Sequence, residues 1–202
     1  RCDGAVNPKH NGQTYYYLHA IERVAAANGR RYINGQDWYR QGAHHILENQ
    51  VRGELSPDVG SIDGNPIDTA FALLFLSRAR VPVWAAKLQI PGQIWNRRPN
   101  DLHYLTRWLS DVREMELNWQ VMPIDRPAEE WLATPLIYLS LNQPLKLTQD
   151  QKATLKRYLD LGGTLLVVPE DGGGPVSQSI RTLAEELYPQ WPLTQVDDRH
   201  SI

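Results

Sequence analysis

A glycine-rich acidic loop is the segment of this sequence best suited to hold a ligand. It combines two carboxylates with three glycines: Glu170, Asp171, Gly172, Gly173 and Gly174. The loop follows the most strand-like run, residues 164–168, and opens a helix at Pro175, which is where α/β sheets bind ligands. Glycines let a ligand approach the backbone, and the carboxylates favour a sugar hydroxyl, a cation or a polar peptide over a phosphate. A flexible turn with a solvated acidic pair is the alternative, and the sequence leaves it open.

A second polar loop follows another apolar run, residues 135–141. Asn142 and Gln143 come directly after this run, and Pro144 follows them. Because parallel strands end at one edge of a sheet, we expect Asn142 and Gln143 to line the same ligand site as the acidic loop. A simple turn is the alternative here as well.

We expect no catalytic residue in this chain. Acyl-transfer chemistry on an α/β fold needs a nucleophile on the sharp turn between a strand and a helix. The turn at residues 169–175 holds neither Ser nor Cys, and Ser177 and Ser179 fall inside the following helix. The single cysteine, Cys2, excludes an intrachain disulfide and a cysteine-only zinc site.

We also expect no metal and no cofactor. His44 and His45 are adjacent, and neighbouring residues of a helix point about 100° apart, so one helix cannot easily offer both to one ion. Asp63 and Asp68 flank the start of a helix, where the helix dipole favours a carboxylate without any catalytic role.

Composition indicates a folded chain without strong charge. Its 202 residues are 42% hydrophobic and 22% charged, and the formal net charge is −2. This balance gives no electrostatic reason to expect nucleic acid as a partner, and no apolar run is long enough to cross a bilayer. The sequence starts Arg-Cys-Asp without methionine, so we expect a fragment or a processed product, and cytoplasmic and periplasmic locations are both allowed.

The first part of the chain, residues 1–88, reads as helices. The first helix carries an apolar face and stops near Gly29, and Asp37 caps a second helix over residues 38–50. The face of the first helix is formed by Tyr17, Ile21 and Val24. Asn65 and Pro66 start a third helix over residues 67–78, which is apolar on most sides and therefore predicted to be buried.

The second part, residues 89–202, alternates strands and helices. Residues 89–99 read as a linker or an edge strand, and Thr148 with Gln151 forms a capping box. Strands are expected at residues 119–124, 135–141 and 164–168. Helices are expected around residues 102–112, from 148 to Gly162, and from Pro175 to Pro189. This alternation predicts a parallel sheet with helices on both faces.

A repeat-like pattern runs through residues 42–50 and Gly53, with His45 in an aromatic position and Leu55 or Ile62 in a tryptophan position. An apolar run follows at residues 67–76. Through these residues, the stretch 14–80 resembles the repeats of prenyltransferases and squalene cyclases, and the run 67–76 is similar to the inner helix of such an α/α toroid. The resemblance implies the end of a toroid-like helical segment. The chain has neither the Asp-rich acid motif of a cyclase nor the Asp, Cys and His zinc set of a prenyltransferase.

Four stretches of the second part carry a family likeness: residues 100–109, 117–121, 135–140 and 155–166. Through them, residues 90–202 resemble the domain-of-unknown-function family 4159. The resemblance implies a flavodoxin-like, class I amidotransferase-like parallel sheet with flanking helices, incomplete at the C-terminus, and family members often carry toroid repeats just upstream.

Three functions remain open. The first hypothesis is a non-catalytic structural or interaction protein that presents a surface to a protein partner or to copies of itself. The second is a binding module for a carbohydrate or another polar small molecule at loop 169–175. The third is a fragment of an enzyme whose catalytic residues lie outside this chain.

Overall fold

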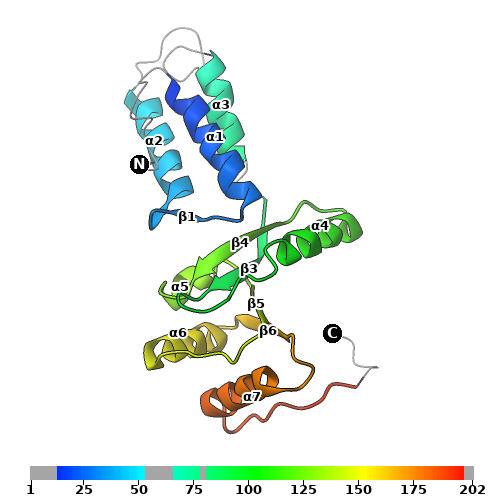
Figure 1. Ribbon diagram of the computed structural model, residues 1–202. Helices are drawn as coiled ribbons and strands as arrows, with labels where there is room; N and C mark the ends of the chain where they lie inside the picture. Colours follow the sequence, from blue (N-terminus) through cyan, green and yellow to red (C-terminus); the bar gives the residue numbers. More distant parts are fainter. Residues whose placement is uncertain (1–12, 53–65, 78–80, 198–202) are drawn as a thin grey trace. The chain divides into compact units, whose positions relative to one another are not determined.

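The computed structural model describes residues 13–52, 66–77 and 81–197 (Figure 1). It divides into two compact units, residues 1–84 with 103–121 and residues 85–102 with 122–202, which are treated separately below. Several residues named above lie outside the described residues: Cys2, Gly53, Leu55, Ile62, Asp63 and Asn65.

Three helices of the first unit pack around an aromatic core. They are α1 (Thr14–Ala27), α2 (Trp38–Arg52) and α3 (Pro66–Ser77). The buried core joins residues of all three: Tyr15, Leu18, Ile21, Ala25, Trp38, Ile46, Ala72 and Phe75. A Cβ at Gly42 would lie 2.5 Å from the Phe75 ring, so glycine is what lets α2 approach α3 this closely. Asp37 caps α2 as expected, because its Oδ1 accepts from the Arg40 amide at 3.0 Å.

Two expectations about these helices are wrong. Val24 is 64% exposed, and the buried face of α1 runs through Leu18, Ile21 and Ala25 instead. Helix α3 is not buried on most sides, because Leu73 is 62% exposed. Only Ala72 and Phe75 of α3 are buried. The apolar composition of α3 predicted more burial than its two neighbouring helices, α1 and α2, provide.

A short hairpin joins α1 to α2. It consists of β1 (Tyr32–Ile33) and β2 (Gln36–Asp37), paired antiparallel. Asn34 and Gly35 connect the strands with φ angles of 52° and 77°, the left-handed conformation that an Asn-Gly hairpin turn requires.

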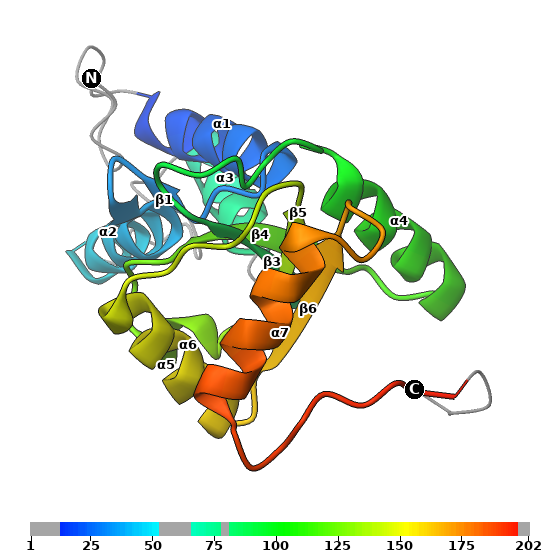
Figure 2. The same cartoon turned by 60° about the horizontal axis from the view of Figure 1, so that its bottom comes forward.

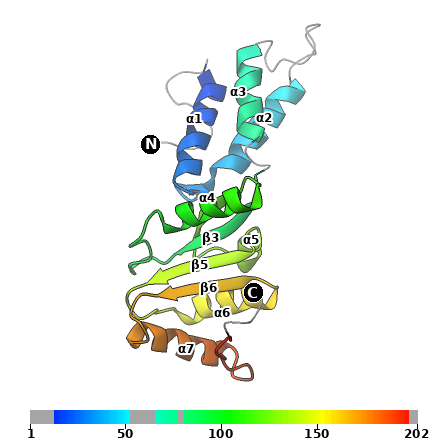
Figure 3. The same cartoon turned by 90° about the vertical axis from the view of Figure 1, so that its right-hand side faces the viewer.

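The α/β part is built on a four-stranded parallel sheet in the order β4-β3-β5-β6. Its strands are β3 (Val83–Gln89), β4 (Asn118–Pro123), β5 (Leu136–Leu141) and β6 (Thr164–Pro169). Strand β5 pairs in parallel with β3 on one side and with β6 on the other (Figure 3). The predicted division between residues 88 and 89 therefore falls inside β3, an inner strand that the sequence reading had not placed.

Helices alternate with these strands along the chain. They are α4 (Asp101–Arg113), α5 (Ala128–Trp131), α6 (Gln149–Asp160) and α7 (Pro175–Leu187). The predicted capping box of α6 is present in full, with Thr148 and Gln151 bonded reciprocally. Helices α6 and α7 lie side by side and are linked by an ion pair between Lys152 and Glu186 (Figure 2).

Among the described residues, strand β6 forms one edge of the sheet. The Thr164 amide donates to the Pro135 carbonyl at 3.0 Å, and the Glu170 amide donates to the Leu141 carbonyl at 2.8 Å. Because successive amides of a strand point to opposite sides, every second amide from Thr164 to Glu170 faces β5. The amides of Leu165 and Val167 accordingly face away from β5. On the sheet face shared with Thr164, Leu166 and Val168 are each 41% exposed.

Candidate functional site

A lysine is buried in the middle of the sheet. Lys87 of β3 is 1% exposed, and its Nζ donates to Asp101 Oδ1 at 2.5 Å and to the Arg98 carbonyl at 2.6 Å. Asp101 is the first residue of α4, and its Oδ1 also accepts from the Leu102 amide at 2.7 Å. A charge this deeply buried is tolerated because it is both paired and hydrogen-bonded.

Tyr138 of β5 extends this pair across the sheet. Its hydroxyl donates to Asp101 Oδ2 at 3.0 Å, and Lys87 Nζ lies 5.9 Å from the centre of its ring. Burial and then the negative charge of Asp101 raise the pKa of Tyr138 to about 12. The phenol therefore stays protonated at neutral pH and acts as a hydrogen-bond donor.

Glu170, one of the predicted ligand residues, lies beside this pair and holds two arginines. Its Oε1 accepts from the Ser140 hydroxyl at 2.8 Å and lies 3.0 Å from Arg98 Nε, and its Oε2 accepts from Arg97 Nη1 at 3.3 Å. The Glu170 side chain is only 11% exposed, whereas the two arginine side chains are 57% and 65% exposed. The Glu170 carboxylate is therefore fully engaged by side chains of this chain, whereas the two arginine side chains are largely exposed to solvent.

These contacts form one group, which we call the carboxyl-edge network: Lys87, Arg97, Arg98, Asp101, Tyr138, Ser140 and Glu170. The network lies where the parallel strands end. The chain continues from β3 to β4 on one side of β3, while β5 lies on its other side and leads to β6. This reversal of strand order is the place where open α/β sheets bind ligands. With three cations and two carboxylates, the network carries a formal charge of +1.

Asp171, the second predicted acid, has a different role from Glu170. Its Oδ2 accepts from the Val176 amide at 2.5 Å and its Oδ1 from the Ser177 hydroxyl at 2.8 Å. Partial desolvation raises the pKa of Asp171, but the bonds from Ser177 and from backbone amides outweigh it and hold the pKa below the usual range. Asp171 thus fills the anion position at the start of α7 that a ligand would otherwise take.

The remaining predicted ligand residues lie around the same edge. Gly172 and Gly173 have φ angles of 62° and 110°, and a Cβ on either would meet no atom within 4 Å. Gly174 precedes Pro175 at the N-cap of α7. Asn142 and Gln143 are half-buried, and Asn142 Oδ1 is shielded from solvent without a hydrogen-bond partner among the described residues.

The loops that follow β3 and β5 are tied together. Gln93 donates from Nε2 to the Lys146 carbonyl at 2.5 Å and accepts from the Lys146 amide at Oε1, at 3.2 Å. This pair of bonds holds the arginine-bearing loop, residues 90–100, against the loop that contains Asn142 and Gln143.

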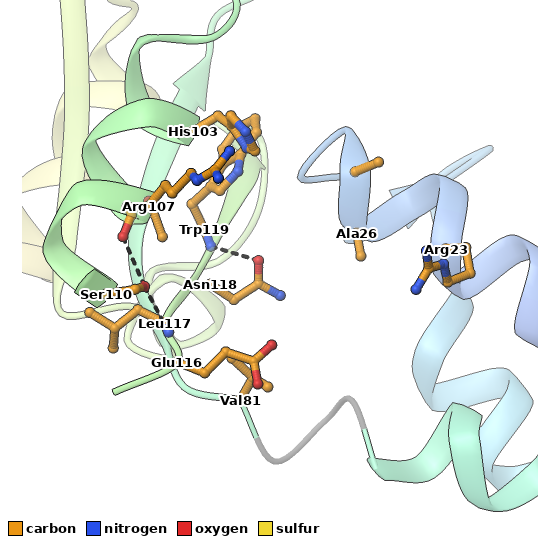
Figure 4. A pocket seen from close by; sticks show the side chains of 12 residues that line it. Arg23, Ala26, Val81, His103, Arg107, Ser110, Glu116, Leu117, Asn118 and Trp119 are labelled. Atoms are coloured by element: carbon orange, nitrogen blue, oxygen red, sulfur yellow. Dashed lines mark hydrogen bonds between the residues drawn. The ribbon is translucent and has the colours of Figure 1, made fainter. Parts of the chain in front are cut away.

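A separate pocket of about 320 Å³ lies in the first unit (Figure 4). Its polar walls include Thr106, Ser110 and Asn118, and each makes a structural hydrogen bond. Thr106 Oγ1 accepts from Trp84, Ser110 bonds the Thr106 carbonyl and the Leu117 amide, and Asn118 accepts from the Trp119 amide. The polar groups of this pocket are already used in hydrogen bonds that stabilise the local structure. The carboxyl-edge network is therefore the stronger candidate for a binding site.

Sequence reasoning missed most of the network. A signal was present for Lys87, since it is the only charge in the apolar run Val83–Gln89 and a charge at such a position needs a buried partner. Asp101 carried a weaker signal as a helix-starting acid. The histidine pair forms no joint site: His44 is exposed and lies 3.5 Å from Glu48, while the His45 ring lies 6.2 Å from that of Tyr15.

The strand order, the parallel pairing and a polar network at the strand ends define an α/β domain with a candidate binding site at its carboxyl edge. A family model described as domain of unknown function (DUF4159) matches residues 84–202. The chain belongs to this family, as its sequence motifs led us to expect. No curated protein and no solved structure matches the chain.

Within the described ranges, no helix is both long and apolar enough to span a membrane. In the same part of the chain, no group of three or more His, Cys, Asp or Glu side chains is arranged to hold a metal ion.

Proposed function

We propose that the α/β domain is a non-catalytic binding module that takes a polar ligand with a carboxylate or phosphate group at the carboxyl-edge network. The observation that carries this proposal is the pair of exposed arginines anchored on buried Glu170. Each guanidinium has five N–H donors, and Glu170 occupies one donor of Arg97 and one of Arg98. Within the described residues, we find no partner for the other donors of these two side chains.

We expect the ligand to be an oxyanion because Glu170 and Asp171 already have partners within the chain. Glu170 is bound by Ser140 and both arginines, and Asp171 is bound by the start of α7. Neither carboxylate is left to bind a cation or a neutral sugar on its own. Two guanidinium groups held by one carboxylate can instead take an anion in bidentate fashion, which is a strong and geometrically specific contact. Asn142, with its unpartnered Oδ1, can accept a hydrogen bond from a hydroxyl on the same ligand.

The test is a binding screen by thermal shift and calorimetry. Phosphate, a sugar phosphate, a dicarboxylate, the neutral sugar and Ca²⁺ are each titrated into the wild-type chain and into an Arg97→Ala/Arg98→Ala variant. We expect the anions to stabilise the wild type and the double variant to lose this effect, since each charge-assisted bond contributes about 1.5–3 kcal/mol.

Two exposed positions serve as the matched control. An Arg40→Ala/Arg181→Ala variant lowers the net charge equally but leaves the network intact. A neutral sugar or Ca²⁺ that binds equally to the wild type and the Arg97→Ala/Arg98→Ala variant would contradict the oxyanion proposal and favour the carbohydrate or cation alternative.

Two finer structural assignments belong to this proposal. The order β4-β3-β5-β6 with parallel β3, β5 and β6 supports a flavodoxin-like, class I amidotransferase-like topology. The packing of α1, α2 and α3 supports a helical-repeat unit of the α/α toroid type for the first segment. An experimental structure of the chain compared with both folds would test these assignments.

Assembly is a second candidate function, and a specific observation favours it. Helix α4 exposes large apolar side chains: Tyr104 is 63% exposed and Trp108 is 60% exposed. Contiguous apolar surface of this kind marks interaction sites. Mass photometry and sedimentation of the wild type and a Trp108→Ser variant test it, and assembly that is unchanged in the variant would contradict a role for α4.

A further inference from the structure

The exposed apolar residues of α4 form a single stripe. Tyr104, Trp108 and Val112 follow one another at intervals of four residues, and Val112 is 57% exposed. At 3.6 residues per turn, such a spacing places all three on one side of the helix. Its inner side is occupied by buried Leu102 and Thr106. The stripe is therefore a true helix face, and we call it the α4 stripe.

A cap ends α4 and with it the stripe. Glu114 has a φ of 50°, and its amide bonds the Asp111 carbonyl at 3.4 Å. The Met115 amide bonds the Ser110 carbonyl at 3.2 Å, which completes a Schellman cap. The left-handed conformation of Glu114 ends the helix, so the α4 stripe consists of Tyr104, Trp108 and Val112.

The charges beside the stripe are self-complementary. Arg107 and Asp111 are exposed, stand one turn apart and lie on the same flank of the stripe. When two copies of a helix pair antiparallel about a two-fold axis, the same flanks face each other, so residue i of one copy meets residue j of the other and the reverse. Arg107 of each copy then lies opposite Asp111 of the other. A parallel pair would bring opposite flanks together and lose both ion pairs.

We infer that the α4 stripe is the contact surface for a second copy of this chain, docked with its α4 antiparallel. The inference rests on the second candidate function, assembly, and names its partner. The apolar part consists of Tyr104, Trp108 and Val112. Trp108 lies next to its own copy near the two-fold axis, and Tyr104 of each copy lies opposite Val112 of the other. The Arg107 and Asp111 pairs at the rim set the direction of the two helices, as flanking charges do in paired helices. Because the apolar part is small, we expect a dimer that forms at about 10–100 µM.

Charge reversal tests both the partner and the direction. Sedimentation velocity is measured on the whole chain for wild type, Arg107→Asp, Asp111→Arg and an equimolar mixture of the two variants. Each variant alone places like charges opposite each other, so we expect its dimer to weaken about tenfold or more. In the mixture, the acid introduced by Arg107→Asp in one copy faces the base introduced by Asp111→Arg in the other. The native Asp111 of the first copy faces the native Arg107 of the second, so the heterodimer regains wild-type strength.

The controls separate this inference from the broader assembly proposal. Arg181→Asp makes the same charge change on α7 and should leave the dimer unchanged. A wild type that stays monomeric at about 100 µM, or a mixture no stronger than its components, overturns the second-copy inference. If the mixture fails while Trp108→Ser still abolishes assembly, the partner is not an antiparallel copy, yet assembly through α4 stands.

Discussion

Removing the buried Lys87 charge should destabilise the α/β sheet more than any surface change in this chain. Met has nearly the shape of the lysine stem, so a Lys87→Met variant keeps the packing and removes the ammonium. It leaves Asp101, only 16% exposed, with the Tyr138 hydroxyl and the Leu102 amide as donors. Breaking one side of a buried ion pair costs about 3–5 kcal/mol, and the two remaining donors favour the lower end, about 3 kcal/mol.

The reverse change should cost more. In an Asp101→Asn variant, the Lys87 ammonium is 1% exposed and keeps only neutral acceptors, the Arg98 carbonyl and the amide oxygen of the new side chain, so we expect a cost of about 4–5 kcal/mol. The double variant leaves no unpaired charge. It should therefore lose only about 1–2 kcal/mol, less than either single change and well short of their sum.

The assay is urea unfolding followed by circular dichroism, together with hydrogen exchange of peptides that cover β3 and β5. Exchange matters because the chain has two units, and the loss should concentrate in the sheet. A Lys156→Met variant, on an exposed i,i+4 pair with Asp160, is the matched control and should change little. Lys87→Met costing under about 1 kcal/mol, or single changes that add up fully, would refute the reasoning.

Three further predictions follow from local geometry. Gly163→Ala should destabilise the chain by about 1–3 kcal/mol in urea unfolding, because its Cβ would lie 2.2 Å from Cζ of buried Tyr158; an unchanged midpoint would contradict this. Glu114→Gly should stabilise it by about 0.5–1 kcal/mol, because φ is 50° there, and a lower midpoint would show that the Schellman cap does not form. The raised pKa of Tyr138 favours the protonated phenol in the folded state, so its contribution to the free energy of unfolding is complete below about pH 10 and is lost between about pH 10 and 12. The free energy of unfolding of a Tyr138→Phe variant, measured across this range, should therefore fall less than that of the wild type.

Local signals in the sequence predicted local structure well. Thr148 and Gln151 lie three residues apart and form both bonds of the expected capping box. Helix α7 begins at the expected Pro175, and its predicted face includes buried Val176 and Leu183. These features depend on residues within one or two turns of each other, so the sequence contains the whole interaction.

Features set by distant partners were harder to predict. Glu170 was identified as a site residue, but its arginine partner Arg97 lies 73 positions away, and no spacing rule links the two. Strand β3 was missed because Lys87 interrupts its apolar pattern, and only Asp101, 14 positions later, explains that lysine. The exposed side of α3 shows the same limit, since composition does not say how many neighbours a helix will have.

The uncharged edge of β6 has a practical consequence for work with this protein. Strand β6 contains no Lys, Arg, Asp or Glu, and charged residues are the usual protection of an edge strand against pairing with other chains. Pro169 supplies no amide, so only the stretch before it can template an added strand. In concentrated samples this edge is the first place to suspect sheet-mediated aggregation, and a lysine at Leu166 or Val168 is the substitution to make before crystallisation or spectroscopy is attempted.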